Sequence, residues 1–334
     1  MFRGLFNFIT DSCTNSLIDN EFLKKLVIKS NCFFDKYWTY KKVLKESTKL
    51  NSSISILGIS NSGKTSYLTA LFYRMLASRN GYLLVGKDAF TSENLLNNVN
   101  NLRNSSLKED RFSPNNKKDI TKYSFDLLYN FDDIVMSLDL YDYSGSVLSS
   151  KRTRNMEDYK KFKDTINKSN SILIFVDSSF LINGDYEDKV DNIKFECASI
   201  FNSFIRDYIE SGNKTLPVSI VVTKYDLLNK SISDEDLCKL IKESFDPLFD
   251  KKTNRLDRIV SIIPVSLGEK ISEKDYTGKL KPVNIYLPFF FALYFALDKN
   301  DKYQNYHREK LKNELINIPY LYKNGKNFSF KDIK

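Results

Sequence analysis

The stretch that decides the fold is Gly58-Ile59-Ser60-Asn61-Ser62-Gly63-Lys64-Thr65. It follows a short apolar run at residues 54–57, which predicts a strand, and it precedes residues 66–72, which have the composition of a helix. A strand, a loop bounded by glycines, a Lys-Thr pair and a helix form, in that order, the context that a phosphate-binding loop requires. The sequence therefore predicts a site for the phosphates of a nucleotide together with Mg²⁺.

Each residue type in this loop has a physical role in holding a polyphosphate. Successive backbone N–H groups surround the phosphates, and the positive end of the following helix points at them. The glycines allow a close backbone approach that a side chain would block. The Lys64 ammonium can reach the β- and γ-phosphates, and the Thr65 hydroxyl can coordinate Mg²⁺. The predicted phosphate-binding residues are Gly58, Asn61, Ser62, Gly63, Lys64, Thr65 and Ser66.

Composition limits the remaining possibilities. The chain has 334 residues, enough for one large α/β domain with appendages, and its net charge of +9 is spread along the sequence rather than gathered in a basic block. Four cysteines without paired spacing are typical of reduced intracellular thiols, so we expect a cytoplasmic protein. The single histidine, His307, stands in a polar tail, which argues against His-dependent catalysis. The longest apolar run, residues 287–297, is too short to cross a bilayer and predicts a buried helix.

Strand-like and helix-like patterns alternate from residue 51 onward. Strands are expected at 54–57, 123–128, 134–141, 171–176, 217–222 and 259–265, and helices at 65–78, 93–102, 158–166, 189–210, 234–245 and 283–296. This alternation predicts an α/β fold, a mainly parallel sheet with helices on both faces. We expect a helical N-terminal extension at 1–50, a nucleotide-binding domain at 51–298 and a charged helical tail at 299–334 with loosely held last residues. The polar stretch between residues 86 and 120 predicts a mobile loop.

A second motif stands where the strand at 134–141 ends. Asp142 places a carboxylate there, and Gly145 follows three residues later. Ligands of open α/β sheets bind at the carboxyl ends of the strands, so Asp142 can face the phosphate-binding loop and hold Mg²⁺ through water. Gly145 can then bring a backbone N–H to the γ-phosphate.

Two further motifs follow the strands at 217–222 and 259–265. The first is Thr223-Lys224-Tyr225-Asp226, and the second contains Ser266 and Leu267. The Asp226 carboxylate can accept both N1–H and N2–H of guanine, a donor pair that adenine lacks, while the Lys224 stem covers the base. The Leu267 N–H can meet guanine O6, so these motifs narrow the ligand to a guanine nucleotide.

Together the motifs resemble those of Ras-like P-loop GTPases of the translation-factor-related class, and more closely bacterial stand-alone or double-GTPase-like proteins. The resemblance covers about residues 52–298 and rests on residues 58–65, 142–145, 223–226 and 266–268. It implies binding of GTP and GDP with Mg²⁺ and a conformational switch driven by GTP hydrolysis. Lys64, Gly145 and a switch threonine would be the catalytic residues, and Thr65, Asp142 and that threonine would hold the metal.

The chain departs from this pattern at several positions. The best switch threonine is Thr121, just ahead of the strand at 123–128, with Thr91 and Ser113 as alternatives. Ser146 stands where Ras-like enzymes carry a glutamine that orients the attacking water, which predicts slow hydrolysis. Ser60 replaces a glycine that admits an arginine finger in trans, and Arg152 and Arg154 could supply one in cis. Thr223 stands where many relatives have Asn, but its hydroxyl can still bridge to the loop.

The leading hypothesis is therefore a GTP-hydrolysing switch that acts on a protein effector. The alternative is a scaffold that binds GTP or GDP without hydrolysis and docks partners through its terminal arms. A homodimer, and peripheral membrane contact through residues 1–30, stay open, while no motif indicates nucleic-acid binding.

Overall fold

The computed structural model describes residues 51–104, 120–131, 133–143, 163–198, 201–202, 215–228, 232–250, 257–268, 280–316, 318 and 320–332. In chain order its main elements are β1 (Asn51–Gly58), α3 (Lys64–Met75), β2 (Tyr82–Gly86), α4 (Ala89–Asn104), β3 (Ile120–Tyr129), β4 (Asp133–Tyr143), β5 (Ser171–Asp177), α8 (Tyr186–Ile193), β6 (Leu216–Thr223), α10 (Asp234–Ser244), α11 (Asp246–Phe249), β7 (Arg258–Pro264), α12 (Leu287–Ala296), α13 (Lys302–Leu315), β8 (Leu321–Lys323) and β9 (Lys326–Asn327). The expected N-terminal extension lies outside the described residues.

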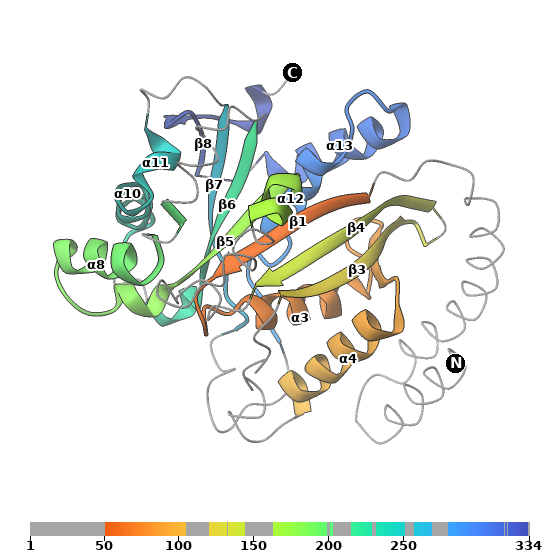
Figure 1. Ribbon diagram of the computed structural model, residues 1–334, viewed down its shortest axis with the longest axis horizontal. Coiled ribbons are helices and arrows are strands. Elements are labelled where there is room, and N and C mark those ends of the chain that lie inside the picture. The colour runs from red at the N-terminus through yellow and green to blue at the C-terminus, as the bar shows by residue number, and fades with distance from the viewer. Residues whose placement is uncertain are drawn as a thin grey trace.

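One mixed sheet organises the molecule (Figure 1). Its strand order is β2-β3-β4-β1-β5-β6-β7-β8-β9. The five central strands, β4, β1, β5, β6 and β7, are parallel, whereas the pairings on both sides of them are antiparallel. Because parallel strands are joined through crossover connections, helices cover both faces of the centre. The predicted α/β class is thus confirmed.

The two faces are covered by different sets of helices. Helices α3, α4, α12 and α13 lie against one face and α8, α10 and α11 against the other (Figure 1). The buried side chains of each set form a separate hydrophobic core with the sheet. Helix α12 has the sequence LPFFFALYFA, apolar all round, and is buried along almost its whole length. A helix without a polar face must be buried, so the run at 287–297 forms the core helix that its composition predicts. Among the described helices, none combines the length and apolar composition needed to cross a bilayer.

The C-terminal segment belongs to the sheet, which corrects the expectation of a loosely held end. β8 pairs with β7, α13 packs against α12, and the Phe330 ring is buried. His307 is also buried, within hydrogen-bond distance of the Tyr82 hydroxyl (3.2 Å to Nδ1), and not in polar surroundings. These residues are isolated apolar or aromatic side chains in a charged sequence, so periodicity does not reveal the face that they bury.

The remaining differences concern segment boundaries. The helix expected at 93–102 is found as α4, which begins four residues earlier, at Ala89. Strand β2 was not predicted, and α4 lies within the stretch expected to be a mobile loop. The long helix expected at 189–210 instead begins as α8 and changes to a π-helix at Lys194–Ala198. Phe195, in this π-helix, is 77% exposed although it stands in a helical pattern.

Candidate nucleotide-binding site

All predicted motifs that the structure describes lie at the carboxyl edge of the parallel strands. Gly58 ends β1, Asp142 stands near the end of β4, Thr223 ends β6 and Ser266 follows β7. Loops that follow parallel strands of one sheet meet at the same edge, where open α/β sheets bind ligands. The fold therefore brings these motifs together, although they are up to two hundred residues apart in sequence. Gly145, with Ser146, Arg152, Arg154 and Ser113, lies outside the described residues.

The loop between β1 and α3 is shaped by residues in left-handed conformations. Asn61 has φ 61° and Gly63 has φ 84°. The Ser62 hydroxyl donates to the Ile59 carbonyl at 2.9 Å, which closes the turn. A side chain at Gly58 would place its Cβ 2.5 Å from Ser62 Oγ and 2.9 Å from the Cβ of Phe175 on β5, so only glycine fits there.

Lys64, the first residue of α3, turns its ammonium back onto this loop. Nζ donates to the carbonyls of Gly58 at 2.8 Å and Ile59 at 2.7 Å. Burial lowers the pKa of Lys64, against the opposing effect of the Asp142 charge. Two carbonyls thus hold the cation within the loop, at the amino end of a helix, where anions bind favourably.

Thr65 and Asp142 meet across the gap between α3 and β4. The Thr65 hydroxyl donates to Asp142 Oδ2 at 3.0 Å. Asp142 is only 6% exposed, and its Oδ1 has no hydrogen-bond partner among the described residues. Burial raises the pKa of Asp142 to about 6, although the Lys64 charge and the Thr65 hydrogen bond act to lower it. A hydroxyl beside a carboxylate with one unused oxygen is an oxygen donor set that suits Mg²⁺.

Thr121 is placed beside Asp142. It is the second residue of β3, not a loop residue ahead of the strand, and it stands directly opposite Asp142 in the antiparallel register. Directly opposed side chains point to the same face of a sheet, so Thr121 and Asp142 share the face that carries α3. The alternative Thr91 is fully buried on α4, and its Oγ1 accepts the Ser124 N–H at 3.0 Å. That hydroxyl already serves the packing of α4 on β3.

The turn at Thr223–Asp226, predicted to hold guanine, contacts the loop at residues 58–65 directly. The Thr223 hydroxyl donates to the Ser62 carbonyl at 2.8 Å, and the Val176 carbonyl lies 3.2 Å from it. This is the bridge expected where relatives carry Asn. Lys224 has the left-handed φ of 53°, and its carbonyl accepts the Ser178 hydroxyl at 2.7 Å. Asp226 follows, half-buried, in a 3₁₀ turn at Tyr225–Leu228.

Ser266 and Leu267 are positioned by the segment that leads into α12. The Ser266 N–H donates to the Val283 carbonyl at 3.4 Å, and the Val283 N–H donates back at 3.0 Å. Next to them, the Val265 N–H donates to the Val222 carbonyl at 2.7 Å and the Val265 carbonyl accepts the Tyr225 N–H at 3.2 Å. The last predicted motif is therefore tied to the Thr223–Asp226 turn.

One residue of this edge was missed by the sequence analysis. Asp177 ends β5, stands opposite Thr223 in the register and forms an ion pair with the Lys224 ammonium. Its Oδ1 also accepts the Ser179 N–H at 2.9 Å. The available signal was an apolar run ending in a carboxylate, the same pattern that identified Asp142. The run at 171–176, which predicts a strand, is followed directly by Asp177.

Comparisons with known proteins bear on the sequence family. Residues 52–256 match the model of the family described as Double-GTPase 2. No curated protein matches the chain.

Solved structures add similarity of a weaker kind. A nucleolar GTP-binding protein from Plasmodium falciparum is 14% identical with a TM-score of 0.33, over 80% of this chain and 98% of that one. An ADP-ribosylation-factor-like small COPII coat GTPase from Encephalitozoon cuniculi, in complex with GDP, is 15% identical with a TM-score of 0.34, over 89% of this chain and 99% of that one. At these sequence identities and TM-scores, the similarity to the two solved structures supports no inference about this chain.

Proposed function

On the premise that the chain belongs to the Double-GTPase 2 family and is a GTP-binding protein of the P-loop type, we propose that it is a guanine-nucleotide switch that hydrolyses GTP to GDP with Mg²⁺. The observation that carries the proposal is the convergence of Lys64, Thr65 and Asp142 on one loop. A cation, a hydroxyl and a buried carboxylate are the groups that a magnesium-bound triphosphate requires. In this role the protein would be a hydrolase of the cytoplasm.

Each of the three residues has a separate task in this proposal. Lys64, already held by two loop carbonyls, neutralises the β- and γ-phosphates at no further cost in side-chain ordering. Thr65 and Asp142, whose Oδ1 has no hydrogen-bond partner among the described residues, would hold Mg²⁺, together with Thr121 from the opposed position on β3. The metal, when bound, neutralises charge that develops on the phosphates. Gly145, which lies outside the described residues, would contribute a backbone N–H to the γ-phosphate.

We propose that the residues that follow β6 and β7 select guanine. Asp226 accepts N1–H and N2–H of the base, the Lys224 stem lies over the ring, and Leu267 donates its N–H to O6. A site whose carboxylate accepts two donors from the base discriminates against a base that lacks them, because both hydrogen bonds to the base are then lost. The Thr223 hydrogen bond to Ser62 supports this assignment, because it fixes the Thr223–Asp226 turn relative to the loop at residues 58–65.

Ser146 favours a second candidate, a scaffold that holds GTP or GDP without turnover. A serine is too short to orient the attacking water as a glutamine does. In the first candidate a protein partner supplies the missing group, and in the second the nucleotide only supports the fold.

Phosphate release separates the two candidates. Full-length protein with GTP and Mg²⁺ should release phosphate slowly but above a Lys64→Ala variant, and chelation of Mg²⁺ should abolish the difference. Release equal to that of Lys64→Ala, in protein that still binds GTP, would leave the scaffold as the function.

A further inference from the structure

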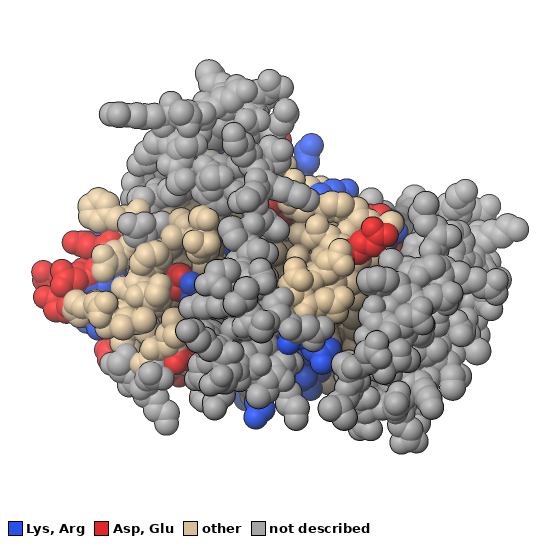
Figure 2. Space-filling model, turned by 90° about the horizontal axis from the view of Figure 1, so that it is seen from below, with Lys and Arg blue, Asp and Glu red and all other residues tan. Residues whose placement is uncertain are grey.

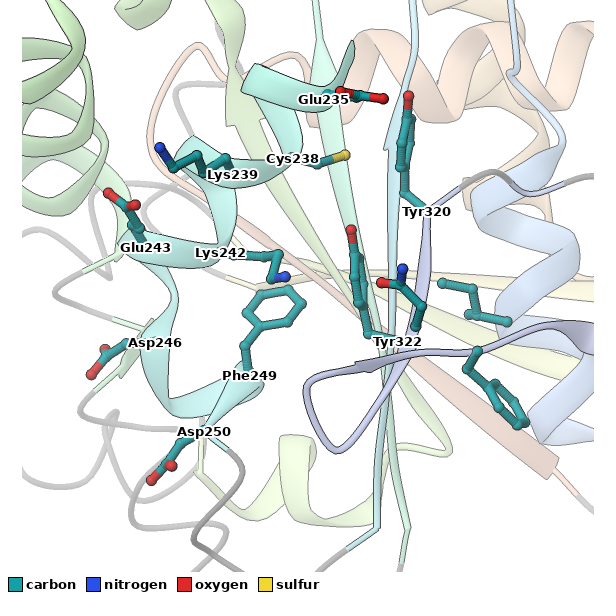
Figure 3. A pocket seen from close by; sticks show the side chains of 13 residues that line it. Glu235, Cys238, Lys239, Lys242, Glu243, Asp246, Phe249, Asp250, Tyr320 and Tyr322 are labelled. Atoms are coloured by element: carbon teal, nitrogen blue, oxygen red, sulfur yellow. The ribbon is translucent and has the colours of Figure 1, made fainter.

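A groove of about 910 Å³ opens on the side of the sheet that carries α10 and α11. Figure 3 shows one wall formed by side chains of these two helices and the other by Tyr322 of β8 and Tyr320 directly before it. No residue of the phosphate-binding loop is among the described residues that line it. The groove is therefore a feature separate from the nucleotide site.

The inner surface of the groove is aromatic. Phe249 and Tyr322 are buried and meet edge to face, with ring centroids 5.3 Å apart. The Lys242 ammonium lies 4.8 Å from the centroid of the Tyr322 ring. An aromatic face attracts a cation placed over it, so the chain's own lysine occupies the kind of position that a cation from outside would take.

The rim of the groove is acidic. Exposed carboxylates outnumber lysines among the described residues that line it: Glu235, Glu243, Asp246 and Asp250 against Lys239 and Lys242. The Asp250 charge also acts on the buried Arg258 guanidinium, so the other three carboxylates carry most of the attraction for a cation. The ammonium of Lys239 also lies over an aromatic ring, that of Tyr186, at 4.8 Å.

The acidic surface continues from the rim of the groove onto the neighbouring helix α8. It presents exposed Glu187, Asp188 and Asp191, and Figure 2 shows acidic side chains gathered at the left end of the molecule, where Figure 1 places α8. In a chain of net charge +9, this end would repel nucleic acids and anionic lipids and attract cationic groups.

The dimensions fit a peptide segment. Residues along the whole of α10, 11 residues long, line the groove, which corresponds to about 16 Å at the rise of an α-helix. Roughly five residues of extended chain span that length. We propose that this groove docks a lysine- or arginine-bearing segment of a protein partner, whose cation lies between the acidic rim and the Tyr322 ring while adjacent apolar side chains cover Phe249. The proposal concerns a site outside the nucleotide edge and does not depend on GTP hydrolysis.

Selection of a random peptide library on the full-length protein tests it, with affinities measured by fluorescence anisotropy at low and high salt. The recovered peptides should carry Lys or Arg next to an apolar residue. Their binding should weaken by about tenfold or more in Glu235→Lys/Glu243→Lys. The matched control Glu187→Lys/Asp191→Lys changes the charge equally on α8, outside the groove, and should cost less than about threefold.

Lys242→Ala should change peptide affinity in the opposite direction. It removes the internal cation from the Tyr322 ring, so peptide binding should tighten by about two- to fivefold, whereas damage to the fold would weaken it. The proposal would be overturned if no peptide is recovered, if the recovered peptides are acidic, or if an oligonucleotide competes for the groove. It would also be overturned if the α8 control loses as much binding as the groove variant, or if Lys242→Ala binds the peptides more weakly.

Discussion

The ion pair between Asp177 and Lys224 gives the sharpest test of how the Thr223–Asp226 turn, which we propose binds guanine, is held in place. Asp177→Asn keeps the shape of the side chain but removes its charge. A hydrogen bond to a charged group contributes about 1.5–3 kcal/mol when it is buried. The Asp177 side chain is 8% exposed but that of Lys224 is 40% exposed, so solvent screens the pair. We therefore expect the Asp177→Asn substitution to cost about half of that value, about 0.8–1.5 kcal/mol, which corresponds to a roughly four- to twelvefold loss of GDP affinity.

The assay is the release of a fluorescent GDP analogue in stopped flow, because loss of preorganisation should act mainly on the rate of dissociation. Lys224→Met should lose a similar amount, and the double variant should lose little more than either single one. Asp139→Asn is the matched control, since Asp139 pairs with Lys122 at 2.9 Å on the sheet face away from the site. Unchanged release in Asp177→Asn, additive losses in the double variant, or an equal effect of the control would refute the reasoning.

Three further predictions test the base turn, the loop and the core. Asp226→Asn should weaken GDP binding by about a hundredfold and gain xanthosine diphosphate, whose 2-oxo group accepts the new amide N–H; calorimetry with both nucleotides measures this, and an unchanged GDP affinity contradicts it. Gly58→Ala should lower the free energy of unfolding by about 1–3 kcal/mol because its Cβ would meet Phe175, and a urea midpoint equal to that of the wild type contradicts it. Burial lowers the pKa of His307 to about 4 from its ordinary 6.5. Between about pH 4 and pH 6.5 the unfolded chain binds more protons than the folded chain, so the free energy of unfolding should decrease as the pH drops. In His307→Gln this decrease should be smaller by about 1–3 kcal/mol, as measured by urea titrations at several pH values. If the free energy of unfolding depends on pH equally in the variant and the wild type, the prediction is wrong.

The convergence of the motifs at one edge of the sheet could be predicted because the sequence signals for each motif are local. A glycine-bounded loop, or an apolar run that ends in a carboxylate, is visible within ten residues, and parallel-sheet topology then brings the loops to one edge. The bridge from Thr223 to Ser62 followed from the hydroxyl of one side chain and the topology of two strands.

The parts that were not predicted depend on contacts between distant segments. β8 has three residues and gains its strand conformation from β7, and the partners of His307 on β2 and β3 are remote in sequence. The partnership of Asp177 with Lys224 requires the register of β5 on β6, which no local pattern specifies.

The central claim is that the loop at residues 58–65 binds a guanine nucleotide. Calorimetric titration of the nucleotide-free, full-length protein with GDP and with ADP, each with Mg²⁺, tests this most directly. We predict that GDP binds at one site per chain, that ADP binds at least about a hundredfold more weakly, and that Lys64→Ala loses GDP binding. Equal binding of ADP, or GDP binding that survives in Lys64→Ala, would contradict the claim.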